Sequence, residues 1–189
     1  MAAALLLAGY DLWDERRAAV SAVETLAVLE DLCPEAPAAP EPADPGEREI
    51  PDYALDPERD MPAAEVKGED YIGTLAIPCL GRELPVMENW SYPKLRTAPC
   101  RYSGSVYRDD MIVAAHNYQA HFGRLKDLTP GDGILFTDTE GNVFRYAVTE
   151  VEILNRYAVE EMAEGNWDLT LFTCTYGGKS RVTVRCRRL

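Results

Sequence analysis

The sequence predicts a mainly β protein, a small closed or nearly closed barrel with short helices, preceded by an α-helix and a proline-rich arm. Two patterns support this fold class. From Tyr71 onward, many short apolar segments are separated by turn residues such as Gly, Pro, Asp and Asn, which is typical of small β-barrels. Before Tyr71, a segment with helical periodicity leads into a region rich in proline, and 8 of the 13 prolines lie between Pro34 and Pro62.

The N-terminal helix is predicted for about residues 12–32. Apolar side chains recur there at spacings of four, three and four residues, which places them on one helix face: Ala22, Leu26, Leu29 and Cys33. Pro34 ends the pattern, because the residue before a proline avoids helical backbone geometry.

An apolar run at residues 2–8 precedes this helix. It is too short to cross a bilayer, and it lacks the basic start and the cleavage site of a secretory signal. Two interpretations stay open: the run is the apolar start of the helix, or it is the end of a truncated membrane anchor.

Three segments follow from these patterns: a helix at 1–33, an acidic proline-rich linker or arm at 34–65, and a barrel at 66–189. The formal net charge of the 189-residue chain is −13. Residues 1–65 hold 16 acidic and 4 basic side chains, whereas residues 66–189 hold 16 and 15. The acidic excess therefore belongs to the extension. This charge argues against nucleic-acid binding, which needs basic surface.

The barrel segment contains seven predicted strands and two short helical turns. The strands are expected at 71–77, 84–88, 111–115, 134–137, 143–154, 169–173 and 181–186. The helical turns are expected at 91–97 and 122–128. A turn-rich segment, 138–142, joins two of the strands as a hairpin.

The sequence contains few of the residue patterns that bind metals or cofactors. The only histidines are His116 and His121, and no Cys-x-x-Cys pair accompanies them, so no metal site is predicted. The chain also lacks a Gly-x-Ser-x-Gly elbow and a phosphate-binding glycine loop. We therefore predict no cofactor.

Cys174 is the candidate nucleophile among the five cysteines. It closes an apolar strand, and the flexible Thr-Tyr-Gly-Gly follows it directly. The chain from Lys179 to Leu189 carries five basic residues and no acidic one, and such surroundings favour a thiolate. His116 ends another apolar strand and is the natural proton partner for a thiol. On these residues alone, a buried structural cysteine and an unrelated histidine remain the alternative.

The order of motifs in this region resembles the sortase family. Thr170-Leu171-Phe172-Thr173-Cys174, followed by a strand bearing Arg181, is similar to the family's cysteine signature. The stretch Val-Ala-Ala-His-Asn ending at Asn117 resembles its histidine motif, with Ala115 where glycine is common. The resemblance covers about residues 70–189, and Tyr-Ile-Gly-Thr-Leu-Ala-Ile-Pro at its start is similar to the usual first strand.

The resemblance implies an eight-stranded barrel with transpeptidase activity at the extracellular face of the plasma membrane of a Gram-positive bacterium. Such enzymes cleave a C-terminal sorting signal of the Leu-Pro-x-Thr-Gly kind through a cysteine thioester. An amine of a cell-wall precursor or a pilin then accepts the acyl group. A membrane anchor usually lies N-terminal to the barrel, which favours the anchor interpretation of residues 2–8. A peptidase that only hydrolyses and a barrel that only binds peptides are the alternatives.

Catalytic roles are carried over to three residues: Cys174 as nucleophile, His116 as general acid and base, and Arg181 as the donor that stabilises the tetrahedral intermediate. Arg185 is the fallback for the arginine, because it shares a strand face with Arg181. Thr173, Tyr118 and Tyr176 flank the site in sequence, and we expect them to bind substrate, with aromatic packing on the barrel wall as the alternative for the two tyrosines.

The remaining cysteines and the subclass are less defined. Cys79, Cys100 and Cys186 are expected to be small buried side chains, with a Cys79–Cys100 disulfide as an alternative. The helix before the barrel is reminiscent of class B, but only 14 residues separate the strands before Cys174 (155–168), so the subclass, class B-like or class D-like, stays open. The acidic arm is either a solvated spacer or a lid over Cys174.

Overall fold

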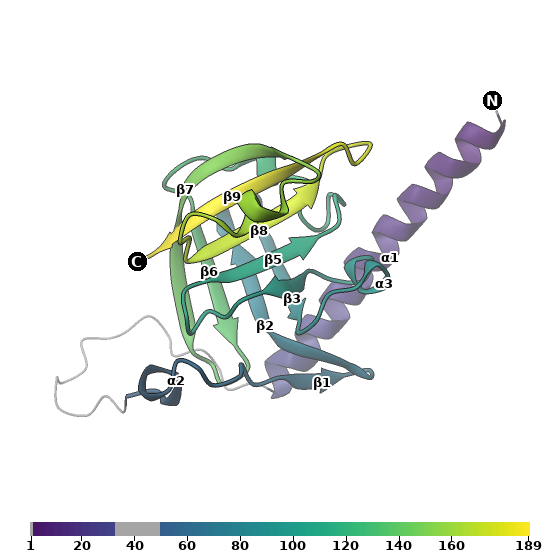
Figure 1. The fold of residues 1–189 in the computed structure, drawn as a ribbon. Coiled ribbons are helices and arrows are strands. Elements are labelled where there is room, and N and C mark those ends of the chain that lie inside the picture. Colours follow the sequence, from purple (N-terminus) through teal and green to yellow (C-terminus); the bar gives the residue numbers. More distant parts are fainter. Residues whose placement is uncertain (1, 33–49) are drawn as a thin grey trace.

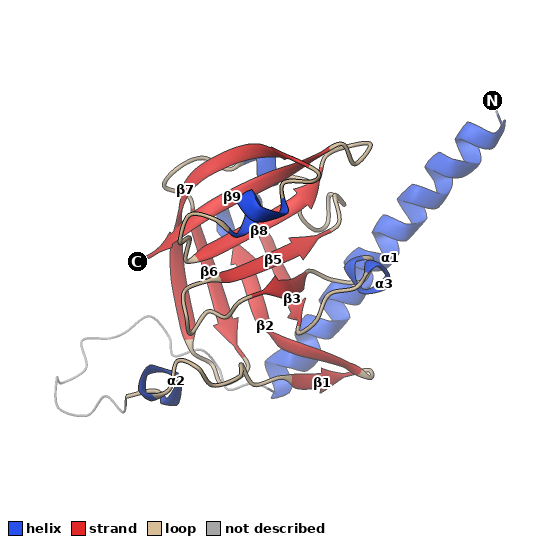
Figure 2. Ribbon diagram, in the orientation of Figure 1, coloured by secondary structure: helices blue, strands red, loops and turns tan. Residues whose placement is uncertain are grey.

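The computed structural model describes residues 2–32 and 50–189, and its strands form one continuous sheet (Figure 1, Figure 2). The strands of this part of the chain are β1 (Ala64–Val66), β2 (Glu69–Ile77), β3 (Arg82–Met87), β4 (Cys100–Ser103), β5 (Met111–Ala115), β6 (Gly133–Asp138), β7 (Val143–Asn155), β8 (Leu169–Cys174) and β9 (Ser180–Arg188). The helices are α1 (Ala2–Leu32), α2 (Asp52–Leu55), α3 (Tyr92–Leu95) and α4 (Val159–Ala163), with 3-10 turns at Pro78–Leu80 and Leu125–Asp127.

Eight strands of the described chain close into a barrel. β2 pairs with β3 along one edge and with β6 along the other, so the order β2-β3-β4-β5-β8-β9-β7-β6 returns to its starting strand. β1 lies outside this ring, and its pairing in the described chain is with the start of β2. The mainly β class and the eight-stranded barrel expected from the resemblance are confirmed.

The seven predicted strands correspond to β2, β3, β5, β6, β7, β8 and β9, and 111–115 matches β5 at both ends. The two predicted helical turns correspond to α3 and to the 3-10 turn at Leu125–Asp127. Sequence analysis missed β1, β4, α2 and α4. Each of these is five residues long or shorter, which is too short for a clear periodic pattern.

The barrel interior is filled by side chains that alternate with outward-facing ones along each strand. Its largest fully buried members include Ile72, Leu75, Phe136, Phe144 and Tyr146. Because this interior is packed with apolar groups, any site for a polar reaction has to lie on the outer face or at the strand ends.

Helix α1 crosses the outside of the barrel, and its N-terminal end points away from the sheet (Figure 1). Its buried residues recur at helical spacing and are mostly small: Asp14, Ala18, Ala22, Thr25 and Leu29. Leu29 belongs to a second apolar cluster with side chains of the first strands, including Val66 and Met87. Of the predicted stripe, Ala22 and Leu29 are confirmed, Leu26 is half-buried, and Cys33 lies outside the described residues.

None of the helices in the described residues, α1 included, combines the length and the apolar character that a membrane span requires.

Residues 50–63 of the predicted arm pack against the barrel. The ring of Tyr53 stacks on Tyr107 with centroids 5.0 Å apart, Met61 is buried, and Arg59 forms an ion pair of 2.9 Å with Glu140. Tyr107 lies shortly before the first residue of β5, whereas the candidate histidine, His116, directly follows the last residue. The arm therefore contacts the barrel near the end of β5 that is farther from His116. Residues 50–63 therefore contact the barrel through Tyr53, Arg59 and Met61, whereas residues 34–49 lie outside the described chain, and the role of the arm stays a prediction.

Candidate functional site

The hairpin formed by β8 and β9 sets the candidate nucleophile opposite the candidate arginine. Cys174 and Arg181 are direct partners across the antiparallel pair. Residues opposite each other in such a pair project from the same face of the sheet, with Cβ atoms about 4.5–5.5 Å apart. The predicted cysteine and arginine therefore lie side by side.

The short turn between the two strands fixes this register. The Ser180 backbone N–H donates to the Thr175 hydroxyl over 3.1 Å, and the Thr175 N–H donates to the Ser180 carbonyl over 2.9 Å. Gly177 and Gly178 follow with φ values of 81° and 67°, a left-handed conformation that side chains disfavour. A glycine pair at this point thus lets six residues join the nucleophile to the arginine.

His116 reaches the same place from β5. β5 runs parallel to β8, and Ala115 is the partner of Thr173 in their register. His116 directly follows Ala115, and Cys174 directly follows Thr173. The histidine and the cysteine therefore lie at the same end of two neighbouring strands. The order of strands in the sheet, rather than any local motif, brings the histidine to the cysteine.

All three residues line one pocket on the outer face of the barrel, with a volume of about 260 Å³. Its floor comes from outward-facing residues of β5 and β8, among them Ala114 and Phe172. On the side of α4, Val159 and Met162 form the wall. The pocket is thus mostly apolar around a small cluster of polar groups, as is common for ligand sites.

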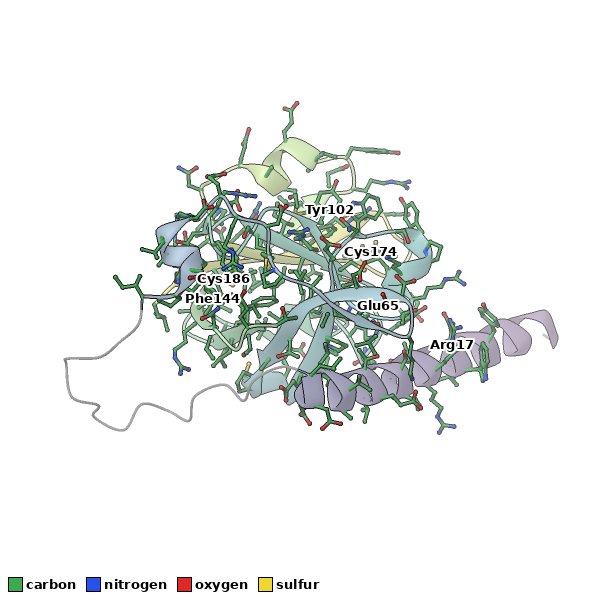
Figure 3. All side chains as sticks on the ribbon, turned by 90° about the horizontal axis from the view of Figure 1, so that it is seen from below. Arg17, Glu65, Tyr102, Phe144, Cys174 and Cys186 are labelled. Atoms are coloured by element: carbon green, nitrogen blue, oxygen red, sulfur yellow. The ribbon has the colours of Figure 1, made fainter. Side chains whose placement is uncertain are left out.

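An aromatic wall completes the pocket and was not predicted. Its rings form a continuous series in which Trp90 lies 5.3 Å from Tyr102, and Tyr102 lies 5.4 Å from Phe172, between centroids. Tyr92 packs edge-on against Trp90 at 5.7 Å. Figure 3 shows Tyr102 beside Cys174, with Phe144 at the opposite end of the barrel. The only sequence signal was a pair of large aromatic residues, Trp90 and Tyr92, in a connecting segment.

The ion pairs of β9 distinguish Arg181 from the arginines that follow it. Arg185, Arg187 and Arg188 each form a salt bridge, with Glu152, Asp168 and Asp109 respectively. Within the described residues, Arg181 has no carboxylate partner and donates only to the adjacent Ser180 carbonyl over 3.2 Å. Its guanidinium is half-buried beside Cys174 and available to a substrate oxygen.

Arg185, the fallback for the oxyanion role, has a different task. Its guanidinium is buried beneath α4 and donates to the carbonyl oxygens of Glu161 and Met162 and to the Thr170 hydroxyl. Arg185 therefore holds the helix that forms one wall of the pocket, and it does not line the pocket itself.

Burial shapes the proton affinities of the histidine and of the other thiols. Burial, together with the nearby Arg96, holds the pKa of His116 below its ordinary value of 6.5, while Asp14 acts in the opposite direction. Burial also raises the pKa of Cys100 and of Cys186 to about 12, which makes both thiols poor nucleophiles at neutral pH. Cys174 is partly exposed in the pocket.

Comparison with known proteins agrees with this geometry. The sequence model of the sortase domain matches residues 75–189, which is more than half of the chain. The chain belongs to the sortase family. A search of curated protein sequences gives no match.

Solved sortase structures share the fold of this sortase. Sortase C1 from Streptococcus suis is 24% identical, with a TM-score of 0.55 over 63% of this chain and 73% of that one. Sortase C from Clostridium perfringens is 21% identical, with a TM-score of 0.56 over 76% and 77%. A lid mutant of sortase A from Corynebacterium diphtheriae is 23% identical, with a TM-score of 0.57 over 73% and 77%. Similarity to both class C and class A structures leaves the subclass open.

The three residues predicted to bind substrate lie outside the pocket lining. Thr173 alternates with Cys174 and points to the other face of β8, where its buried hydroxyl donates to the Ala115 carbonyl over 2.8 Å. A substrate role for Thr173 does not fit this placement, and its hydroxyl instead ties β8 to β5. Tyr118 donates its hydroxyl to Asp14 of α1, and Tyr176 is 95% exposed in the β8–β9 turn. Substrate contact by these tyrosines stays a prediction.

Predictions for the other cysteines are partly confirmed. Cys100 and Cys186 are buried, as expected, whereas Cys79 is exposed on the 3-10 turn after β2. Its position in a tight surface turn, rather than within a strand, explains the difference. Cys79 and Cys100 are both free thiols in this structure, so the alternative of a disulfide between them does not hold.

His121 is a buried imidazole without a polar partner. It is 1% exposed, and neither ring nitrogen has a hydrogen-bond partner in the described chain. Burial therefore lowers the pKa of His121 to about 4, far below the ordinary value of 6.5. The folded sortase must keep this ring uncharged.

Replacing His121 is expected to make the stability of the sortase less dependent on pH. The unfolded chain binds a proton at His121 near pH 6.5, whereas the folded chain does so only near pH 4. Stability is thus complete above pH 6.5 and falls by about 3 kcal/mol as the pH drops toward 4. His121→Phe, or the smaller His121→Leu, should remove this loss in urea unfolding at pH 5 and pH 7.5. An unchanged pH dependence in both His121 variants would contradict the argument.

Proposed function

We propose that this sortase is a transpeptidase that cleaves a sorting signal of the Leu-Pro-x-Thr-Gly kind and transfers the acyl fragment to an amine. The observation that carries the proposal is the meeting of Cys174, Arg181 and His116 in one pocket, with the first two as direct cross-strand partners. Membership of the sortase family supports the same activity.

In the first half-reaction, the Cys174 thiolate attacks the carbonyl carbon of the scissile peptide bond. A carbon–sulfur bond forms, and the carbonyl oxygen becomes an oxyanion. The Arg181 guanidinium, held beside the sulfur, donates hydrogen bonds to that oxyanion, where a fixed cationic donor contributes most. The carbon–nitrogen bond then breaks, and His116 gives its proton to the leaving amine.

In the second half-reaction, an incoming amine attacks the thioester. His116 takes the proton from the attacking nitrogen, and the second tetrahedral intermediate again places its oxyanion at Arg181. The carbon–sulfur bond breaks, and Cys174 returns as a thiolate. The nucleophile is an amine of a cell-wall precursor or of a pilin, and water gives hydrolysis in its place.

The walls of the pocket suit an extended peptide with apolar side chains. Leu95, Val159 and Met162 offer aliphatic surface, and the rings of Trp90 and Tyr102 are well placed to pack on a leucine or a proline. The proposed location is the outer face of the plasma membrane of a Gram-positive bacterium, since sortases act there. Helix α1 would then lie between the membrane and the barrel.

Mass spectrometry with a panel of sorting-signal peptides tests the proposal. We expect one peptide class to leave an acyl adduct on Cys174 and an added amine to convert that adduct into a transpeptidation product. Hydrolysed product alone, with and without amine, would favour a peptidase. No adduct with any peptide, in a protein whose Cys174 still reacts with iodoacetamide, would overturn the proposed reaction.

A further inference from the structure

Helix α1 carries a buried carboxylate where it meets the loop that follows β5. Asp14 is only 4% exposed, although it belongs to a helix on the outside of the barrel. The Tyr118 hydroxyl donates to one carboxylate oxygen, and Arg17 donates to the other over 2.9 Å. A buried charge needs such partners, and here one of them comes from 104 residues further along the chain.

The Tyr118 ring links this carboxylate to the proposed catalytic histidine. Its centroid lies 4.9 Å from that of His116 and 5.5 Å from that of His121, so the ring packs against both imidazoles. Anchoring the Tyr118 hydroxyl on α1 fixes the surface on which His116 rests.

A second contact holds the same loop. The backbone N–H of Gln119 donates to the side chain of Glu15. Two successive carboxylates of α1, Asp14 and Glu15, thus bind two successive loop residues, Tyr118 and Gln119. This matched pair of contacts fixes the loop against the helix more firmly than one hydrogen bond can.

We propose that Asp14 is a positioning residue that acts through Tyr118 on His116, which makes α1 a support for the catalytic histidine. The inference rests on the proposed function for its catalytic meaning. Its geometric part is that α1 holds His116 through Tyr118. That part depends only on the Asp14–Tyr118 hydrogen bond and on the packing of the Tyr118 ring against His116.

Charged and titratable groups surround His116 on several sides. They are Asp14 and Arg17 from α1, Arg96 from the end of α3, Tyr118 and His121 from its own loop, Cys174 from β8 and Arg181 from β9. Burial and Arg96 lower the pKa of His116, and Asp14 opposes them. Removing the Asp14 charge should therefore lower this pKa further and leave less imidazolium to protonate the leaving amine.

The test compares Asp14→Asn and Tyr118→Phe with Glu24→Gln. Glu24 is also a carboxylate of α1, but it pairs with Lys67 at the β1–β2 turn, away from the pocket. We expect kcat to fall about tenfold in the first two variants, because small shifts of a catalytic group are costly. KM for the peptide should not change in Asp14→Asn, since Asp14 does not line the pocket. Glu24→Gln should match the parent protein.

Histidine NMR gives a readout that needs no turnover. The chain has two histidines, so the ring signals of a labelled sample are assigned with one additional variant, His116→Ala. Asp14→Asn should shift the titration midpoint of His116 downward. Tyr118→Phe should not, because the Asp14 charge remains. The double variant should lose no more kcat than Asp14→Asn alone, since that single variant already removes both the contact with Tyr118 and the charge.

The outcomes separate this inference from the proposed function. If the parent protein forms no acyl adduct but the His116 midpoint still moves in Asp14→Asn, the reaction is wrong and the coupling holds. If Asp14→Asn and Glu24→Gln both leave the midpoint and kcat of an active enzyme unchanged, Asp14 does not position His116. Additive losses in the double variant would also overturn the inference.

Discussion

Replacing Cys174 by alanine is expected to abolish peptide cleavage and the acyl adduct, a loss of at least about a thousandfold in turnover. No other thiol described in the structure can take its place, because Cys100 and Cys186 are buried with a pKa raised to about 12, and the exposed Cys79 does not line the pocket. Since Cys174 ends its strand and points outward, the melting temperature should change little. A fluorogenic sorting-signal peptide and thermal unfolding provide the two measurements.

Cys79→Ala is the matched control for this variant. Cys79 is an exposed thiol of the same chain, on a turn that does not line the pocket. Its removal should leave turnover and adduct formation unchanged. Full activity in Cys174→Ala, or loss of activity in Cys79→Ala, would show that the nucleophile is misassigned.

Arg181→Lys is expected to lower kcat by about a hundredfold or more, with little change in KM or in the melting temperature. Lysine keeps the positive charge but loses the planar fork of donors that can hold an oxyanion. The folded state does not depend on this guanidinium, because its only hydrogen bond within residues 2–32 and 50–189 is to the neighbouring Ser180 carbonyl. Steady-state kinetics and thermal unfolding of the same preparation measure both effects.

Arg185→Lys should give a different pattern. Its guanidinium is buried and bonded to Glu152 and to two carbonyls of α4, so we expect a loss of about 2–3 kcal/mol in unfolding free energy. Activity should fall mainly through KM, as α4 loosens its side of the pocket. Retained kcat in Arg181→Lys, combined with its loss in a folded Arg185→Lys, would move the oxyanion role to Arg185.

The barrel was predictable because its longer strands carry their signal locally. The apolar run of β5 and the turn residues between β6 and β7 specify strands without knowledge of their partners. β4 and α4 carry no such signal. β4 has four residues and an irregular register with β5, and α4 is held by hydrogen bonds from Arg185, which lies over 20 residues away.

The candidate site was predictable in part for the same reason. Cys174 and His116 end apolar strands, which marks them in the sequence, and the family motif supplied their proposed roles. Periodicity alone placed Arg181 and Arg185 on one face of β9 and could not distinguish their roles. The structure distinguishes them, because α4 buries Arg185 and accepts its hydrogen bonds. The burial of Asp14 was beyond prediction, because its partner Tyr118 belongs to a different part of the chain.

The alternation along β8 also affects how the specificity of this sortase can evolve. Leu169 and Leu171 face the barrel interior and maintain the fold, whereas Phe172 lies on the opposite face and forms part of the pocket floor. One strand thus holds two sets of positions with different physical tasks. Substitutions at Phe172 can change which peptide side chain is accommodated without opening a cavity in the core. A family built on this strand can therefore diversify its substrates while each member keeps the same folded scaffold.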